Sequence, residues 1–510
     1  MAQRLRIVVV GGGTAGWMMA SGLSRLLPSD QYDLTLIESD EIGTVGVGEA
    51  TLPHIKQFND RLGIDEAEFM RATGATIKLG IEFVGWNNPT DRYIHPFGAF
   101  GEPWAGVDFQ HHWARARLAG IDAGSLQDYC YAIELCRANA FELPDADTAS
   151  IRSTYSYAYH FDAGLYAGFL RGWATRRGAK RIEGRITDVH RDAETGHVRS
   201  LTLKSGESVE GDFFVDCSGF RSLLVGGACQ VPWCDWSEWL PCDRALAVPS
   251  DRVEPLTPFT RATAAKAGWT WRIPLQHRIG NGYVFSSRWC GEEEAHDTLM
   301  AALDGPAQME PRLLRFAAGR WARAWAGNCL AVGLASGFLE PLESTSIFLI
   351  QAALFDLVEL MPRAGGIDPR LPAEFNRLFA IHYDRVRDFL VLHYMANSRH
   401  GEPLWDHVRT MPLPDSLMHK LELFREGAVA PGYKLGLFSR DSWLSVFEGQ
   451  GVMPGDYARL ADRLPLAELE KRLSDLRTRI RDGVVGVPSH GDFIKRHCAA
   501  RDAAGQGEAA

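Results

Sequence analysis

The sequence predicts a mixed α/β fold that begins with a parallel β-α-β unit. Three observations support this fold class: an apolar run at residues 5–10, a glycine cluster directly after it, and a second apolar run at residues 34–37. Both runs are short and rich in β-branched or large aliphatic side chains, as in the buried strands of a parallel sheet. Residues 15–27, between the two runs, are expected to form the crossover helix.

The glycine cluster indicates what this unit binds. Gly11, Gly13 and Gly16 fit the pattern G-x-G-x-x-G, and Glu38 ends the second strand. The first glycine allows a sharp turn, the second a close approach of a pyrophosphate, and the third tight packing of the helix on the strand. An acid about twenty residues further on suits a ribose hydroxyl. The pattern predicts dinucleotide binding; a glycine-rich turn without a ligand is the alternative.

A third apolar run favours FAD as the dinucleotide. Residues 212–219 read D-F-F-V-D-C-S-G, another buried strand that ends in small residues. One N-terminal fingerprint followed, after a long insertion, by such a strand is typical of the glutathione-reductase-like FAD-binding fold, which is a Rossmann-type β-α-β unit with an inserted β-sheet. Because no second fingerprint for NAD(P) is present, the flavin is expected to arrive already reduced or to meet its reductant only transiently.

Composition excludes several other classes of protein. The chain has 510 residues with a net charge of −10, which argues against a nucleic-acid partner. It contains no apolar stretch long enough to span a membrane, and the first strand starts so early that no signal peptide is expected. Nine cysteines without framework spacing suggest reduced thiols in the cytoplasm and give no metal site.

Periodicity and turn residues predict the remaining elements in order. Helices are expected at 53–62, 65–72, 108–119 and 126–139, with a strand at 76–86 that carries Lys78 and an aromatic loop at 93–98. Asp162 is a candidate N-cap for the next helix. A β-meander follows at 180–191, 198–204 and 208–217, then a hairpin at 268–287 with Asn281-Gly282 at its turn. A strand at 328–333 precedes helices at 343–361, 373–398, 415–426 and 464–481.

These elements suggest two regions and a tail. Residues 1–350 are expected to form the FAD-binding module, with inserted, substrate-facing segments at about 86–160 and 220–325. Residues 351–500 are expected to form a mainly helical C-terminal region packed on that module. The small, polar residues 501–510 are expected to be disordered.

Five segments together resemble the flavin-dependent tryptophan halogenase family. They are G-G-G-T-A-G-W at 11–17, G-V-G-E-A-T at 46–51, G-A-T-I-K-L-G-I-E-F-V-G-W at 74–86, W-x-W-x-I-P at 269–274 and A-V-G-L-A-S-G-F-L-E-P-L-E-S-T-S-I at 331–347. The resemblance runs from residue 4 to about 460. It is specific, because ordinary flavin hydroxylases share the first motif but lack the lysine strand and W-x-W-x-I-P.

The resemblance implies an activity and a set of site residues. Family members use reduced FAD (FADH2), O2 and a halide to make hypohalous acid, which reaches a lysine matching Lys78; that lysine forms a haloamine or hydrogen-bonds the oxidant. A separate flavin reductase supplies the FADH2, and the substrate is a small aromatic molecule. A homodimer is one possible oligomeric state. The implied residues are Lys78 and Glu343 for catalysis; Gly11, Gly13, Thr14, Ala15, Gly16, Glu38, Ala50, Ile186, Leu334 and Ile347 for FAD; Thr345 and Ser346 for the halide; His95 and Phe97 for the substrate; and Trp269 and Trp271 for shaping the flavin site.

Residue chemistry offers a plainer interpretation beside each of these roles. Lys78 taken alone is a strand-edge lysine that faces water, but inside an apolar strand its pKa is expected to be depressed, which favours a neutral, nucleophilic amine. Glu343 taken alone is an acid that suits a helix N-terminus, where free N–H groups also suit a halide. Trp269 and Trp271 are otherwise sheet core, and His95 is otherwise a loop histidine.

Two departures from the family concern the substrate and the halide. Ser346 stands where free-tryptophan halogenases typically carry glycine, so we expect a reshaped halide site. Residues 437–451 have no tyrosine pair and no adjacent Phe-Trp to clamp an amino-acid backbone. We therefore expect an indole-like ring as substrate, and bromide as a better halide than chloride. A single-component aromatic monooxygenase and a non-catalytic flavin-binding protein are the alternatives.

Overall fold

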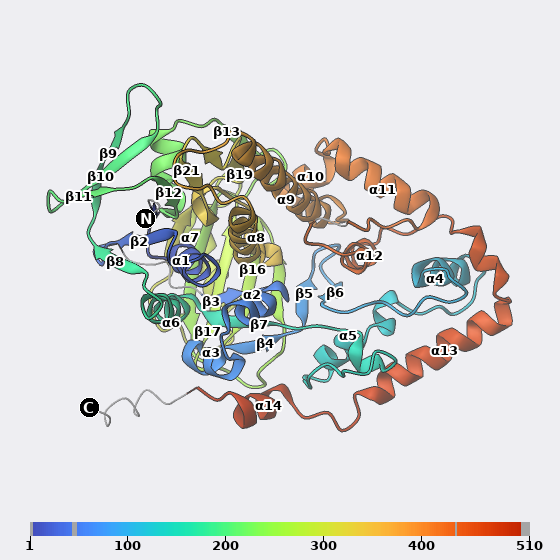
Figure 1. Ribbon diagram of the computed structural model, residues 1–510. Helices are drawn as coiled ribbons and strands as arrows, with labels where there is room; N and C mark the ends of the chain where they lie inside the picture. Colours follow the sequence, from blue (N-terminus) through green and yellow to red (C-terminus); the bar gives the residue numbers. More distant parts are fainter. Residues whose placement is uncertain (1–3, 43–47, 434–435, 501–510) are drawn as a thin grey trace.

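The computed structural model describes residues 4–42, 48–433 and 436–500 (Figure 1). Most of the glycine-rich loop that precedes Gly48, and the expected tail at 501–510, lie outside these residues. The described chain combines a parallel-type sheet, a large mainly antiparallel sheet and a helical region, as the sequence predicts for a mixed α/β protein with a glutathione-reductase-like FAD-binding fold.

The first sheet confirms the predicted β-α-β unit. Its strand order is β20-β21-β12-β1-β2-β8. β1 (Leu5–Val10) pairs in parallel with β2 (Tyr32–Glu38) on one side and β12 (Phe213–Asp216) on the other. α1 (Thr14–Leu26) connects β1 to β2. The remaining strands are β8 (Lys180–Glu183), β20 (Trp325–Ala326) and β21 (Cys329–Ala331).

The second large sheet lies between the flavin-type unit and the helical region (Figure 1). Its order is β18-β14-β17-β16-β15-β5-β6, antiparallel except where β15 runs parallel to β5. Its strands are β5 (Gly80–Val84), β6 (Arg92–Pro96), β14 (Arg244–Ser250), β15 (Thr260–Ala265), β16 (Gly268–Pro274), β17 (Ile279–Phe285) and β18 (Arg312–Arg315). The expected aromatic loop at 93–98 is thus mostly strand β6.

The predicted single strand at 76–86 is wrong in one respect, because it divides between two sheets. β4 (Thr76–Lys78) joins β3 (Gly48–Ala50) and β7 (Ala158–Asp162) in a three-stranded antiparallel sheet, whereas β5 belongs to the large sheet. The change occurs at Leu79, whose N–H donates to Pro258 O at 2.7 Å and whose carbonyl accepts from Phe97 N at 2.8 Å.

The predicted hairpin turn at Asn281-Gly282 is also wrong. Residues 275–278 connect β16 to β17, and both Asn281 and Gly282 lie inside β17. The Asn281 amide donates to Ser250 Oγ at 2.9 Å across the sheet. A Cβ on Gly282 would lie 2.1 Å from the Trp271 ring, so the glycine is required by packing of that ring and not by a turn.

Two small sheets complete the β structure. β9 (Ile186–Arg191), β10 (Val198–Leu203) and β11 (Ser208–Glu210) form the expected meander, although β8 and β12, predicted as part of it, join the first sheet. The other contains β13 (Trp233–Asp235), β19 (Gly319–Trp321) and β22 (Gly337–Phe338).

Helices cover the first sheet and form the part of the molecule farthest from the β9–β11 meander (Figure 1). Asp162 caps the helix that follows β7, as expected, since its carboxylate accepts from Gly164 N at 2.9 Å. The helices are α2 (His54–Leu62), α3 (Glu66–Thr73), α4 (Phe109–Leu118), α5 (Tyr131–Arg137), α6 (Ala163–Thr175), α7 (Glu292–Ala301), α8 (Thr345–Glu359), α9 (Arg370–Met395), α10 (Pro403–Thr410), α11 (Asp415–Gly427), α12 (Arg440–Gly449), α13 (Leu466–Gly483) and α14 (His490–His497).

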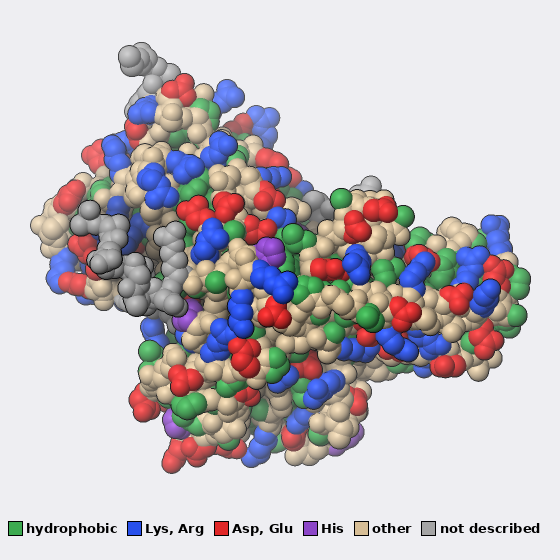
Figure 2. All heavy atoms as spheres, turned by 90° about the horizontal axis from the view of Figure 1, so that it is seen from below, with side chains coloured by type: hydrophobic (Ala, Val, Ile, Leu, Met, Phe, Trp, Pro, Cys, Tyr) green, Lys and Arg blue, Asp and Glu red, His purple; other side chains and the backbone are tan. Residues whose placement is uncertain are grey.

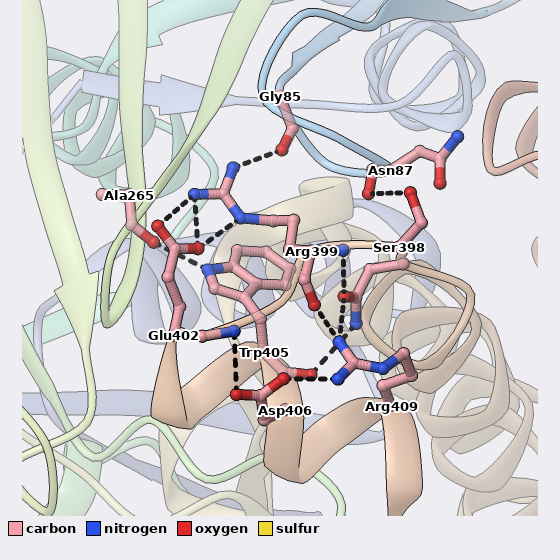
Figure 3. Close-up of polar contacts among 11 residues, drawn as sticks. Gly85, Asn87, Ala265, Ser398, Arg399, Glu402, Trp405, Asp406 and Arg409 are labelled. Carbon is pink, nitrogen blue, oxygen red and sulfur yellow. Dashed lines mark hydrogen bonds and ion pairs between the residues drawn. The ribbon is translucent and has the colours of Figure 1, made fainter.

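A polar network joins the α9–α10 connection to the end of β5 (Figure 3). Arg399 is buried, donates to Gly85 O at 2.6 Å and pairs with Glu402. Trp405 Nε1 donates to Ala265 O at 2.8 Å, and Ser398 N donates to Asn87 O at 2.8 Å. The helical region is therefore fixed to the sheet through the backbone carbonyls of Gly85, Asn87 and Ala265.

In the view of Figure 2, acidic and basic side chains are interspersed over the described residues, without a broad area of one sign. Among the described helices, none combines the length and apolar character needed to cross a membrane.

Candidate active site

The first cavity of the site has a volume of about 420 Å³ and lies at the carboxyl ends of β1 and β2. It brings together most of the predicted flavin residues with both tryptophans of W-x-W-x-I-P. The predicted residues that line it are Gly11, Gly13, Thr14, Ala15, Glu38, Ala50, Ile186, Leu334, Ser346, Ile347, Trp269 and Trp271.

Glycine is required at the three fingerprint positions for different structural reasons. A Cβ on Gly11 would lie 2.4 Å from Cys217 O, and a Cβ on Gly16 would lie 1.8 Å from Gly11 O, so packing excludes both. A Cβ on Gly13, in contrast, would meet no atom within 4 Å and would point into open space. Gly13 is also the N-cap of α1 and provides no side-chain cap, which leaves the first N–H groups of the helix for an anion. This cradle fits the pyrophosphate of a dinucleotide.

Glu38 lines the cavity but already has protein partners. Trp17 Nε1 donates to Glu38 Oε2 at 3.1 Å, and the Arg181 guanidinium pairs with Oε1. Each carboxylate oxygen can accept more than one hydrogen bond. Glu38 is therefore oriented by Trp17 and Arg181 and can still accept from a ribose hydroxyl.

Trp269 stands against a buried acid that the sequence analysis did not single out. Its Nε1 donates to Glu340 Oε2 at 3.0 Å, and the Tyr394 hydroxyl donates to the same oxygen. Burial raises the pKa of Glu340 to about 7. This acid, three residues before Glu343, thus fixes the orientation of the tryptophan that faces the flavin cavity.

A second cavity, of about 400 Å³, lies on the other side of the site. Four separate segments line it: residues 52–54, 95–99, 153–156 and 437–442, with the exception of Arg440. Both predicted substrate residues, His95 and Phe97, are in its wall. His95 Nε2 is buried and has no hydrogen-bond partner among the described residues, so a ligand in this cavity can supply one.

Lys78 lies between the two cavities. Its side chain is fully buried, so the alternative of a lysine that faces water is excluded. Nζ donates to Ser344 Oγ at 2.8 Å, and Ser344 lines the first cavity. Nζ also lies 5.2 Å from the centre of the Phe97 ring, which lines the second. Burial lowers the pKa of Lys78 to about 7, opposed by the negative charge of Glu343, in agreement with the expectation from its apolar strand.

Glu343 is fully buried between two imidazoles. His95 Nδ1 lies 2.9 Å from Glu343 Oε2, and His393 Nε2 lies 2.9 Å from Oε1. Burial acts to raise the pKa of Glu343, but His95 and His393 outweigh it and hold this pKa at about 2. His393 Nδ1 lies 2.8 Å from Phe389 O, which only accepts, so Nδ1 carries a hydrogen.

His393 is the functional candidate that the sequence analysis missed. It comes from α9, far along the chain from both β6 and Glu343, and no spacing links the three residues. The available signal was a histidine inside an otherwise apolar run, residues 389–394, which is an uncommon core residue.

The predicted halide residues open helix α8. The 3-10 turn Pro341–Glu343 is followed by Ser344 in the left-handed conformation, with φ of 57°, and the helix then begins at Thr345. No side chain caps this helix start, and Thr345 Oγ1 is buried without a described partner. Free backbone N–H groups and an unpaired hydroxyl suit a small anion.

Comparisons with known proteins agree with this geometry. The sequence model of the family described as tryptophan halogenase matches residues 6–466. Tryptophan 6-halogenase SttH of Streptomyces toxytricini is 37% identical, with 96% of this chain and 97% of that protein covered. The flavin-dependent halogenase Xcc4156 from Xanthomonas campestris has a TM-score of 0.93 at 45% identity, covering 98% of this chain and 99% of that one. BrvH, a flavin-dependent halogenase from Brevundimonas sp. BAL3, has a TM-score of 0.93 at 42% identity, covering 97% and 99%.

The resemblance inferred from the five sequence segments is therefore confirmed across nearly the whole chain. A single-component monooxygenase and a non-catalytic flavin-binding protein are not favoured by these relatives, which are halogenases. The chain belongs to the tryptophan halogenase family and is a flavin-dependent halogenase.

Proposed function

We propose that this enzyme halogenates an electron-rich indole ring, with Lys78 carrying the halogen from the flavin cavity to the substrate cavity. The observation that supports this proposal is the position of Lys78, whose Nζ contacts Ser344 of the first cavity and Phe97 of the second. FAD bound as FADH2, together with O2, supplies the oxidising equivalents that convert a halide ion into hypohalous acid.

Transfer of the halogen through Lys78 then takes place in two steps. The neutral amine of Lys78 takes the halogen from hypohalous acid, forming an N–X bond and releasing water. The ring carbon takes the halogen from nitrogen, the ring loses its proton to a base, and the amine regains a proton. Neutral lysine is the nucleophilic form, and the lowered pKa of Lys78 supports this role.

Glu343 is placed to accept the proton that the substrate ring loses and to balance the positive charge that develops on that ring. Its carboxylate is held ionised by His95 and His393, so it can stabilise the positive charge that develops on the ring. His95 also reaches the substrate cavity, which connects the carboxylate to the ring side of the site. Thr345 and Ser346 are the proposed halide ligands.

The charge of the second cavity supports a neutral substrate. The lining residues that the structure describes include one acid, Asp441, and neither lysine nor arginine. The carboxylate of free tryptophan would therefore lose water without gaining a cationic partner, at a cost of several kcal/mol. A neutral indole avoids that cost and contacts the Phe97 ring, where an aromatic pair contributes about 1 kcal/mol.

The test is a reconstituted reaction with a generic flavin reductase, NADH, FAD, and chloride or bromide, against a panel of indoles read by mass spectrometry. We expect indole to react faster than tryptophan, at its most electron-rich carbon. NADH without the reductase should leave the flavin oxidised, because a separate reductase is the proposed source of FADH2. Faster chlorination of tryptophan at a benzo-ring carbon would contradict the substrate assignment, and rapid bleaching of the flavin by NADH alone would contradict the reductase.

A further inference from the structure

The outer edge of β4, the strand that carries Lys78, is closed by the C-terminal helix. Among the described residues, β4 is the last strand of the sheet β3-β7-β4, so its outward N–H groups face no neighbouring strand. Ile77 N, adjacent to Lys78 in the chain, donates instead to His490 Nε2 at 3.1 Å. Both residues are fully buried, so bulk water does not reach this pair to replace the acceptor.

His490 is held in the one tautomer that can perform this task. Its Nδ1 lies 3.0 Å from Leu256 O, which only accepts, so Nδ1 carries the hydrogen and Nε2 presents a lone pair to Ile77 N. Burial lowers the pKa of His490 to about 4, which keeps the ring neutral at physiological pH. The carbonyl of Leu256 therefore orients the ring for the edge of β4.

The helix that supplies His490 is anchored independently of this hydrogen bond. His490 N donates to Asn139 O at 2.9 Å, and the Phe493 ring meets the Phe141 ring edge-on with centres 4.6 Å apart. Gln276, in the β16–β17 connection, donates to Cys498 O at 3.0 Å. In Figure 1, the chain returns from α13 to α14, which lies below α3 and β4 in this view.

We propose that His490 is a positioning residue for halogen transfer, which acts on Lys78 through the backbone of Ile77. The proposal rests on the role proposed above for Lys78. The Lys78 amine must keep its place between Ser344 and Phe97, and a displacement of about 1 Å in such a site can lower a rate by about 100-fold. Without the His490 acceptor, the Ile77 N–H is buried and unpaired, and β4 can regain a partner only by moving.

The proposed role of His490 does not depend on direct contact with the ligands, because of where α14 lies. The helix lies beyond residues 6–466, which the family model matches, and it lines neither cavity. None of its side chains therefore needs to contact flavin, halide or substrate for His490 to influence the reaction.

The experiment compares His490→Met with His490→Gln in the full-length enzyme. Both replacements are unbranched and similar in length, but only glutamine offers an oxygen acceptor to Ile77 N. The readout is coupling, defined as halogenated indole formed per FADH2 oxidised, measured beside the FAD dissociation constant and the melting temperature. We expect His490→Met to lower coupling about tenfold with FAD binding changed less than twofold, and His490→Gln to regain at least half of the lost coupling.

Phe493→Ala is the matched control, because it loosens the same helix but keeps His490. We expect its coupling to remain within twofold of the wild type at a temperature where it is folded. Wild-type coupling in His490→Met, an equal loss in Phe493→Ala, or no recovery in His490→Gln would each overturn the positioning role. Absence of halogenated product from the wild-type enzyme would instead refute the proposed function, so the two failures are distinct.

Discussion

The two cavities on either side of Lys78 are built in different ways. The first contains three short motifs, the glycine turn after β1, the end of β2 and the start of α8, together with residues from several other segments between 48 and 338. The second is formed by side chains from four segments that are separated by up to several hundred positions in the sequence. The glycine turn presents backbone N–H groups, which do not depend on side-chain identity, whereas the wall of the second cavity can change one residue at a time. The difference indicates that flavin binding and substrate choice can vary independently.

Lys78, which lies between the two cavities, gives the sharpest test of whether flavin binding and substrate choice are independent. We expect Lys78→Met to lower halogenated product at least about 1,000-fold, because no lysine is among the described residues that line either cavity and could replace this amine. FAD affinity and the rate of flavin reoxidation should change less than twofold. Methionine suits this buried position, so the variant should fold. Stopped-flow absorbance and mass spectrometry measure both quantities, with Lys204→Met, an exposed lysine, as the control.

A substitution at Gly13 should disable the first cavity and leave the second intact. Gly13 has φ of −74°, which any residue can adopt, and its Cβ direction is open. We expect Gly13→Val to weaken FAD binding about 100-fold, since the side chain occupies the space of the pyrophosphate. Indole binding, followed by quenching of protein fluorescence, should stay within twofold. Unchanged FAD affinity would place the phosphates elsewhere.

The pH dependence should reveal which form of Lys78 accepts the halogen. With a pKa of about 7, the neutral amine is the minor form below that pH, so coupling should fall about tenfold per pH unit below 7 and level off above 8. The folded state binds fewer protons at Lys78 than the unfolded state between pH 7 and about 10.4, so the contribution of this group to the unfolding free energy rises with pH in that window. A profile that declines with pH would favour a protonated lysine that hydrogen-bonds the oxidant.

A substitution in the wall of the second cavity should weaken substrate binding and leave FAD binding unchanged. Phe97→Ala removes the ring beside Lys78, and loss of an aromatic contact of about 1 kcal/mol corresponds to about a fivefold rise in KM for indole. The FAD dissociation constant should not change. An equal effect on indole and on FAD would show that the two cavities are not independent.

The smallest expected effect concerns the halide at the start of α8. Ser346→Gly should reduce the preference for bromide over chloride by about threefold, because it removes a hydroxyl and a Cβ from the first cavity. Competition between the two halides at equal concentration, read by mass spectrometry, measures the ratio directly. An unchanged ratio would exclude Ser346 as the source of halide preference.

The sequence analysis predicted the first cavity better than the second for physical reasons. Glycine spacing and strand ends are local signals, so the β-α-β unit and the adjacent β12 could be inferred from short segments. The division of 76–86 at Leu79 depends on hydrogen bonds to Pro258 and Phe97, which no local pattern reveals. His393 reaches Glu343 only because α9 brings its ring against Phe83 of β5, with ring centres 4.8 Å apart. Contacts of this kind depend on tertiary packing, which overrides local propensity.

The contact between His490 and Ile77 has a consequence for the order in which the protein is made. The glycine turn, Lys78, Trp269 and the start of α8 are all translated before α14. Chains generally fold from the N-terminal side during synthesis, so a growing chain can complete the flavin cavity while the edge of β4 is still open. In such a chain the N–H of Ile77, next to Lys78, still lacks the acceptor that His490 provides. This part of the site is therefore complete only after α14 has been synthesised and has packed against the edge of β4.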